Sequence, residues 1–206
     1  MAESVPWQEL LSTGTEAVQE DVIRWYQRTK EGKAYVPNMI WGTLQTEAYA
    51  TAILQQVVHF LGVPDDVPAG VAKRMERQRV LHEGEHHYDV ILGEQALYTN
   101  IGGPTVMRGQ IDRLLRDIDL PSLTLGIIPA TARLAIFPAP AFGIYGEGDT
   151  VNVELVSSEL DITDESEVNL HHKMFALLRE GAAYGDEAAS LLRQAQSFWA
   201  KTPLTE

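Results

Sequence analysis

The segment from residue 88 to residue 128 constrains the fold most, because helical and strand patterns alternate within it. Apolar and polar residues alternate over 88–93, which predicts a strand. A Gly-Gly-Pro turn at 102–104 opens a helix over 104–118 that has apolar residues along one face. Residues 123–128 (LTLGII) form a short, fully apolar strand. A strand, a helix and a second strand in this order could form one right-handed parallel crossover.

Periodicity also assigns the flanking segments. Three helices are predicted before residue 88, and two after residue 160, the first of them opened by a capping box at Asp164. A hairpin is predicted between them, with an acidic turn over 146–149. This order favours an α+β fold with a small central sheet, mixed or antiparallel, flanked by N-terminal and C-terminal helices. The predicted helices are 15–28, 47–61, 68–81, 166–178 and 186–199, and the hairpin strands are 142–145 and 151–156.

The length of 206 residues fits one domain. We expect an N-terminal helical extension over 1–34, a single α+β regulator-type ligand-binding domain over 35–200 and a tail over 201–206. Hydrophobic residues make up 45% and charged residues 22% of the chain, as in globular proteins. No apolar run reaches the length of a membrane span, and the N-terminus has no signal-peptide pattern. We therefore expect a cytoplasmic protein without membrane contact.

The charge balance limits the partners. Sixteen Lys and Arg residues against 29 Asp and Glu residues give a net charge of −13, which repels phosphate and argues against direct nucleic-acid binding. The absence of cysteine excludes disulfides and thiolate chemistry. Eight carboxylates and no Lys or Arg lie between residues 147 and 167. We interpret them as a solvated face, and the alternative is a surface for a cation or a basic partner.

Residues 82–86 (HEGEH) match the H-E-x-x-H pattern of zinc proteases. That pattern needs a helix, whereas here Gly84 lies at its centre and the segment falls between a predicted helix and a predicted strand. We therefore expect a solvated connection and no metal, although His171, His172 or a distant carboxylate could supply a third ligand. No phosphate-binding glycine motif or nucleophile elbow is present, so no cofactor is predicted.

Several polar residues stand where apolar ones would be expected, and they suggest a small-molecule pocket. Glu94 and Glu154 close predicted strands, and Gln45, Arg77 and Gln110 lie in or beside predicted helices. Structural ion pairs would give the same pattern. The apolar, proline-containing segment 130–141 has three interpretations: simple packing, a lid over the pocket or a partner surface.

Four short motifs are distinctive: 41–50 (WGTLQTEAYA), 74–81 (RMERQRVL), 94–97 (EQAL) and 102–111 (GGPTVMRGQI). In order and spacing they resemble the C-terminal effector domain of actinobacterial Scr-type, antitoxin-like regulators of the Xre family. The resemblance covers about residues 35–196. In that family the domain follows an Xre-type helix-turn-helix, whereas here only about 34 residues precede the match and hold one clear helix. Trp41 replaces the proline of the family's P-G-L-L-Q-T motif, and the segment after Pro129 is apolar where the family is polar and glycine-rich.

The resemblance implies a sensor or accessory protein that binds a small ligand or a protein partner and does not bind DNA by itself. In this hypothesis, the polar part of the ligand is held by five side chains and its apolar part by Trp41 and Phe142. A homodimer is an open alternative. The five polar side chains are Gln45, Arg77, Glu94, Gln110 and Glu154.

The alternative hypothesis is a cofactor-free enzyme of natural-product biosynthesis, such as a cyclase or an isomerase. Glu94 or Glu154 would then act as general acid or base, Tyr98 as a hydrogen-bond donor and Trp41 as a stacking wall. An apolar pocket would raise the pKa of such a carboxylate and suit it to proton transfer near neutral pH.

Overall fold

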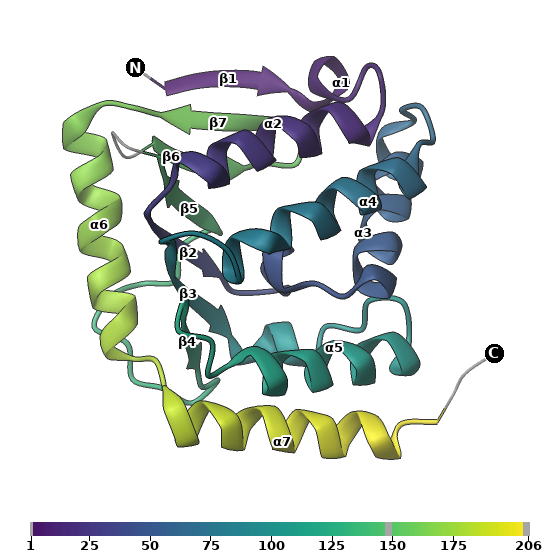
Figure 1. Ribbon diagram of the computed structural model, residues 1–206. Helices are drawn as coiled ribbons and strands as arrows, with labels where there is room; N and C mark the ends of the chain where they lie inside the picture. Colours follow the sequence, from purple (N-terminus) through teal and green to yellow (C-terminus); the bar gives the residue numbers. More distant parts are fainter. Residues whose placement is uncertain (1, 147–149, 204–206) are drawn as a thin grey trace.

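A seven-stranded mixed sheet forms the centre of the computed structural model, which describes residues 2–146 and 150–203 (Figure 1). The strand order is β1-β7-β6-β5-β2-β3-β4; β2, β3 and β4 run parallel, and the other neighbours are antiparallel. The strands are β1 Ala2–Pro6, β2 Glu31–Val36, β3 His87–Gly93, β4 Leu123–Ile128, β5 Phe142–Tyr145, β6 Thr150–Glu154 and β7 Ser158–Ile162.

Helices cover both faces of this sheet. In Figure 1, α6 lies along one face, whereas α2, α4 and α5 lie on the other, and α7 runs beside α5. The predicted α+β class, with a mixed sheet between flanking helices, is confirmed. The helices are α1 Trp7–Leu10, α2 Thr15–Arg28, α3 Glu47–Leu61, α4 Val67–Arg77, α5 Pro104–Asp117, α6 Glu165–Glu180 and α7 Gly185–Lys201, with short 3₁₀ turns η1 Gly42–Leu44, η2 Gln78–Leu81 and η3 Glu94–Leu97.

The segment 88–128 has the predicted organisation. β3 and β4 pair in parallel, with Tyr88 opposite Leu123, and α5 connects them. The predicted hairpin is also present, because β5 and β6 pair antiparallel. Its turn, apart from Gly146, lies outside the described residues. Asp164 caps α6 as predicted, since its carboxylate accepts the N–H groups of Ser166 and Glu167 at 3.0 and 3.3 Å.

The N-terminal residues are part of the same sheet, which differs from the expected extension over 1–34. The boundary at residue 34 falls inside β2, a central strand between β5 and β3. β1 is an edge strand that pairs with β7. The sequence patterns did not predict β1, β2 or β7, because each mixes charged and apolar residues: AESVP, EGKAYV and SELDI, respectively.

A long-range cap fixes α2 against the loop before α4. Gly14, at the N-cap of α2, has φ 106° and no side chain to cap the helix. The carboxylate of Asp66 takes that place and accepts the backbone N–H groups of Thr15 and Glu16 at 2.6 and 2.9 Å and the hydroxyl of Thr15 at 2.7 Å. A Cβ at Gly14 would collide with this carboxylate, so the position requires glycine.

Each sheet face carries its own apolar core. The face toward α2, α5 and α7 buries Tyr88, Leu92 and Met107, among others, and the face toward α6 buries Ile91, Phe142 and Phe175. The apolar segment 130–141 packs on the second core through its aliphatic side chains, which supports the packing interpretation, although Phe137 is 68% exposed. None of the helices within the described residues is both long and apolar enough to cross a membrane.

Candidate functional site

The loop and 3₁₀ turn between β2 and α3 lie among α2, α4 and α5, and buried amides hold their backbone. The amide of Gln110, which has no exposed surface, accepts the N–H of Thr46 at 2.7 Å and donates to the carbonyl of Leu44 at 2.8 Å. The amide of Gln45 donates to the carbonyl of Ile40 at 2.8 Å. Two residues predicted to bind a ligand are therefore engaged with the protein's own backbone.

The same network continues into α5 with its charge neutralised. Arg113 donates to the carbonyl of Gln45 at 3.1 Å and to the side-chain oxygen of Gln78 at 2.6 Å. Its guanidinium also forms an ion pair with Asp117 at 2.9 Å. The amide of Gln78 donates to the carbonyl of Gln45 at 2.6 Å. This part of the network is saturated and structural.

Arg74 and Arg77, one turn apart on α4, differ from Arg113 because, among the described residues, their hydrogen-bond partners are side-chain amides and include no carboxylate. Both donate to the side-chain oxygen of Gln19 on α2, at 3.2 and 3.4 Å, and Arg74 also donates to the Gln45 side chain at 2.8 Å. Within the described part of the chain, no carboxylate lies within 4.0 Å of either guanidinium. Burial, followed by the charge of Arg77, lowers the pKa of Arg74 to about 10.

Arg77 is the deeper of the two arginines and is only 6% exposed. Its guanidinium carbon lies 5.0 Å from the ring centroid of Tyr26. Its Nε is buried and has no hydrogen-bond partner. The approach to η1 is close, since a Cβ on Gly42 would stand 2.5 Å from an Arg77 guanidinium nitrogen. A buried donor without an acceptor costs about 1–3 kcal/mol or more when charged, so this nitrogen calls for an explanation.

Four aromatic side chains lie together in the core next to the Arg77 guanidinium: Tyr26, Trp41, Tyr88 and Tyr145. Tyr26 lies 5.8 Å from Trp41, 5.5 Å from Tyr88 and 4.9 Å from Tyr145 between ring centroids. The hydroxyl of Tyr145 accepts the Trp41 indole N–H at 3.1 Å and lies 3.0 Å from the Tyr26 hydroxyl. Burial raises the pKa of Tyr145 well above its usual value, with Tyr26 adding to the shift. Trp41 and the Arg77 guanidinium therefore both lie against the ring of Tyr26.

Phe142 does not join Trp41. It faces the opposite side of the sheet, where its ring lies 5.9 Å from Tyr35 and 5.2 Å from His171. The two residues were expected to form one apolar wall, but successive strand residues point to opposite faces. Phe142 shares the face of Ile144, whereas Tyr145 shares the face of Trp41.

The residues of the enzyme hypothesis are spread along one end of the sheet. The carboxylate of Glu94 accepts the N–H of Ala130 at 2.6 Å and thereby anchors the loop after β4. Tyr98 packs edge-on against Phe198 at 5.3 Å, and burial raises its pKa, with Glu94 adding to the shift. Glu154 is exposed at the end of β6, which is separated from β3 and Glu94 by β5 and β2.

The HEGEH segment is not helical. The ring of His86 contacts the carbonyl of Thr29 at 2.7 Å and stacks near Tyr88, and Gly84 has φ 81°. His82 directly follows η2. Within residues 2–146 and 150–203 there is no group of three or more potential ligands arranged to hold a metal ion.

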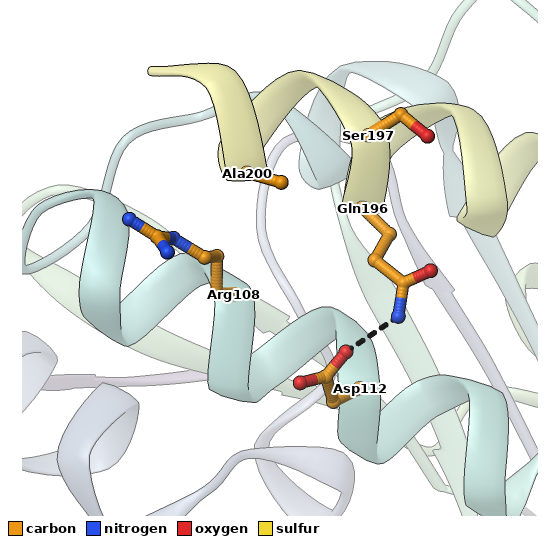
Figure 2. Close-up of a pocket in the computed structure, with 5 residues that line it drawn as sticks. All are labelled: Arg108, Asp112, Gln196, Ser197 and Ala200. Carbon is orange, nitrogen blue, oxygen red and sulfur yellow. Dashed lines mark hydrogen bonds between the residues drawn. The ribbon is translucent and has the colours of Figure 1, made fainter. Parts of the chain in front are cut away.

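Two open hollows lie along α7, and neither is lined by an expected site residue. The first, about 310 Å³, lies between α5 and α7, where the side chain of Gln196 donates to Asp112 at 2.7 Å and the Nε of Arg108 has no partner (Figure 2). The second, about 490 Å³, lies beside it. The first is lined by Arg108, Asp112, Gln196, Ser197 and Ala200, the second by Ser190, Arg193, Gln194, Ser197, Phe198 and Lys201.

The sequence hypothesis missed Gln19, Arg74, Tyr26 and Tyr145. Gln19 is a polar residue on the apolar stripe of α2, at i−4 from Ile23 and i−7 from Tyr26. A polar residue at such a position was the signal that could have identified it. The spacing of three between Arg74 and Arg77 was the second signal, because it places both on one helix face.

A comparison with protein-family models shows the family of this chain. Residues 19–194 match the model of a domain of unknown function, DUF5753. The chain belongs to this family. The DUF5753 match runs from within α2 to within α7, so it includes Gln19, both arginines and the aromatic residues around them.

The other comparisons add little to the DUF5753 assignment. The curated proteins contain no match. Among solved structures, the chain is similar to that of TrmBL2, an archaeal chromatin protein described as showing a novel mode of DNA binding. The identity is 13% and the TM-score 0.42, over 89% of this chain and 53% of that chain. This chain thus spans about half the length of TrmBL2, and the similarity is too weak to carry an argument about function.

Proposed function

We propose that this chain is a binding domain that recognises a small molecule through an anionic group held by Arg74 and Arg77. The observation that carries the proposal is the unpartnered Nε of Arg77, a side chain that is 6% exposed. Two neighbouring guanidinium groups without a counterion repel each other, and a buried charge without a partner is costly. A bound carboxylate or phosphate would satisfy both groups through charge-assisted hydrogen bonds.

The surroundings suit a small ligand. Arg74 is partly exposed and Arg77 is buried, so the pair runs from the surface into the core. Gln19 and Gln45 orient the guanidinium groups without neutralising them. The net charge of −13 opposes an extended polyanion, whereas a single anionic group needs only the local field of the arginines.

This proposal keeps the sensor role that the resemblance to Xre-type regulators implies and assigns no DNA contact to the chain itself. It replaces the expected ligand contacts of Gln110 with a structural role. We favour it over the enzyme alternative because one carboxylate oxygen of Glu94 accepts the N–H of Ala130 and because β5 and β2 separate Glu154 on β6 from β3 and Glu94.

Thermal unfolding in sodium benzoate and sodium phosphate, at the ionic strength of a sodium chloride reference, tests the proposal. An anion present at about ten times its Kd stabilises the folded state by about 1.4 kcal/mol. For a domain of this size that corresponds to a rise in Tm of about 3–6 °C. Arg77→Met should abolish the rise, and Arg74→Met should reduce it.

Two arginines serve as controls. Arg79→Gln removes an exposed arginine just beyond α4, and Arg108→Ala removes a part-buried arginine whose Nε also lacks a partner. Both variants should respond to anions like the original chain. If Arg77→Met fails to fold, the anion-dependent rise in Tm of Arg74→Met and of Arg77→Lys still tests the proposal. The same Tm in anion and in chloride for the original chain, or an equal loss in Arg79→Gln, refutes the proposal.

A further inference from the structure

The outer face of α7 is exposed along the length of the helix. Its inner face carries the buried residues, such as Leu192 and Trp199, and packs on α5, β4 and η3. In Figure 1, α7 runs along the lower border of the molecule and α5 lies above it. The outer face presents a stripe of exposed residues at the three- and four-residue spacing of one helix face: Glu187, Ser190, Gln194, Ser197 and Lys201, with Phe198 beside it.

This face carries both a hollow and an exposed apolar side chain. The hollow of about 490 Å³ is lined by α7 residues alone, among them the small side chains of Ser190 and Ser197. Phe198 also lines it and is 49% exposed. The ring of Phe198 is held by edge-on contacts with Tyr98 at 5.3 Å and Trp199 at 5.0 Å. A fixed aromatic ring beside a hollow is the arrangement of anchor and pocket that protein interfaces use.

The two ends of the stripe carry opposite charges. Glu187 lies in the first turn of α7, and Lys201 is its last residue. Among the described residues, neither side chain forms an ion pair within the chain. Glu187 and Lys201 each lie seven residues from Gln194, and Ser190 and Phe198 each lie four residues from it. The stripe is therefore complementary to itself when its direction is reversed.

We propose that α7 is the contact surface of a homodimer, in which the α7 helices of two copies pair antiparallel about a twofold axis at Gln194. In such a contact, residues at equal distances on opposite sides of the axis face each other. Glu187 of each copy then meets Lys201 of the other copy. Phe198 of each copy enters the hollow of the other copy beside Ser190. The arginines of α4 take no part, so this interface is independent of the proposed anion site.

An unsatisfied donor lies at one end of the same surface. The Nε of Arg108 on α5 is buried without a hydrogen-bond partner, at the hollow of about 310 Å³ that Ala200 also lines (Figure 2). Antiparallel pairing brings the start of the other copy's α7, with the exposed Asp186, to this end of the interface. The carboxylate of Asp186 is then placed to accept from Arg108. A buried donor without an acceptor is uncommon in a complete assembly.

The size of the surface sets the expected strength of the dimer. The 17 residues of α7 span about 25 Å, so a pair of such helices buries less than a standard interface and the dimer should be weak and reversible. Sedimentation velocity of the full chain, from about 5 to about 500 μM, measures the association. The mass should rise with concentration from that of the 22.9 kDa monomer toward twice that value.

Two variants test the contact itself. Gln194→Lys places two ammonium groups face to face at the twofold axis and should raise the Kd of the dimer about tenfold or more. Phe198→Ala removes the anchor from both hollows and should raise the Kd at least as much. If Phe198→Ala loses its fold, Gln194→Lys, which changes an exposed side chain, still tests the proposal. Phe60→Ala, which removes a 71% exposed ring from α3, is the matched control and should leave the Kd unchanged.

A charge exchange tests the register. Glu187→Lys and Lys201→Glu should each raise the Kd about tenfold, because the ion pair occurs twice in the dimer and becomes a repulsion. The double variant Glu187→Lys/Lys201→Glu restores opposite charges across the interface and should recover most of the affinity. Glu165→Lys, in the exposed first turn of α6, is the matched control for charge and should leave the Kd unchanged.

The outcomes decide the proposal. A chain that stays monomeric up to about 500 μM overturns it. A dimer whose Kd is unchanged in Gln194→Lys and in Phe198→Ala also overturns it, because α7 then lies outside the contact. If both single charge reversals weaken the dimer and the double variant stays equally weak, the antiparallel register is wrong. Recovery of affinity in the double variant alone supports the twofold pairing of α7.

Discussion

The amide of Gln110 allows a quantitative test, because it bridges two backbone groups around η1. In Gln110→Met the side chain keeps nearly the same volume, so no cavity forms, but both hydrogen bonds are lost. Leu44 is fully buried, so leaving its carbonyl without a hydrogen bond should cost about 2–3 kcal/mol, the upper part of the range for an unsatisfied buried group. The N–H of Thr46 is part-buried, so loss of its hydrogen bond should cost about 1 kcal/mol.

The expected destabilisation is therefore about 3–4 kcal/mol, a large share of the stability of an ordinary domain. Equilibrium unfolding in urea, followed by far-ultraviolet circular dichroism and tryptophan fluorescence, measures it. The midpoint should fall while the slope m stays constant, since the surface exposed on unfolding does not change. Gln95→Met is the control: Gln95 is exposed and its 3.4 Å contact with Thr99 is marginal, so a change within about 0.5 kcal/mol is expected.

A loss below about 1 kcal/mol at constant m would refute this reasoning. It would mean that water reaches both backbone groups or that η1 rearranges without cost. In either case the loop around Trp41 would not be held rigidly beside the arginines.

The other predictions concern pH, capping and the aromatic cluster. The pKa of Glu159 is about 7 in the folded state and ordinarily 4.5, so the folded state binds the proton more tightly. The free energy of unfolding should therefore fall as the pH rises from 4.5 to 7. In Glu159→Gln the urea midpoint should vary less with pH across that range. Burial favours a higher pKa for Asp66, but hydrogen bonds from the α2 N-terminus lower it overall. Asp66→Ala should cost about 1–2 kcal/mol in urea unfolding at pH 7, and the difference should shrink as the pH falls below 3.8 and vanish below the lowered folded-state pKa. Tyr145→Phe removes the acceptor of the Trp41 indole and should cost about 1–2 kcal/mol while shifting Trp41 fluorescence; an unchanged spectrum would contradict the assigned contact.

Periodicity predicted the elements whose burial is one-sided or complete. β4, residues 123–128, is apolar apart from Thr124, because the core of one face and Tyr184 on the other cover it. β2 and β7 escaped prediction for a physical reason. Lys33 lies inside β2 with its ammonium 3.2 Å from a ring nitrogen of His172, and Glu159 and Asp161 lie inside β7 among polar partners. Charged side chains in a sheet interior break the alternation that identifies a strand.

At the candidate site, the sequence pattern identified one residue of each hydrogen-bonded pair but not its partner. Gln45, Arg77 and Gln110 were recognised as polar residues at apolar positions, and the fold brings all three around η1. Their partners could not be inferred, because the contacts between Gln19 and the arginines join positions more than 50 residues apart. Only the packing of α2 on α4, fixed by the Asp66 cap, creates them.

A shortage of carboxylates does not explain the unpaired arginines, since the chain has 29 acidic residues for 16 basic ones. Arg113 and Arg179 each reach an aspartate at 2.9 Å. What keeps Arg74 and Arg77 charged and unpaired is the amide of Gln19, which stands where a carboxylate could stand. Gln19→Glu tests this directly: the new carboxylate would pair with both guanidinium groups and lower their combined positive charge, raise the stability of the free protein by about 1 kcal/mol or more, and weaken anion binding. A variant that is stabilised but binds anions with unchanged affinity would show that the ligand does not use these arginines. A variant that is destabilised would show that the anion is not simply replacing a missing carboxylate.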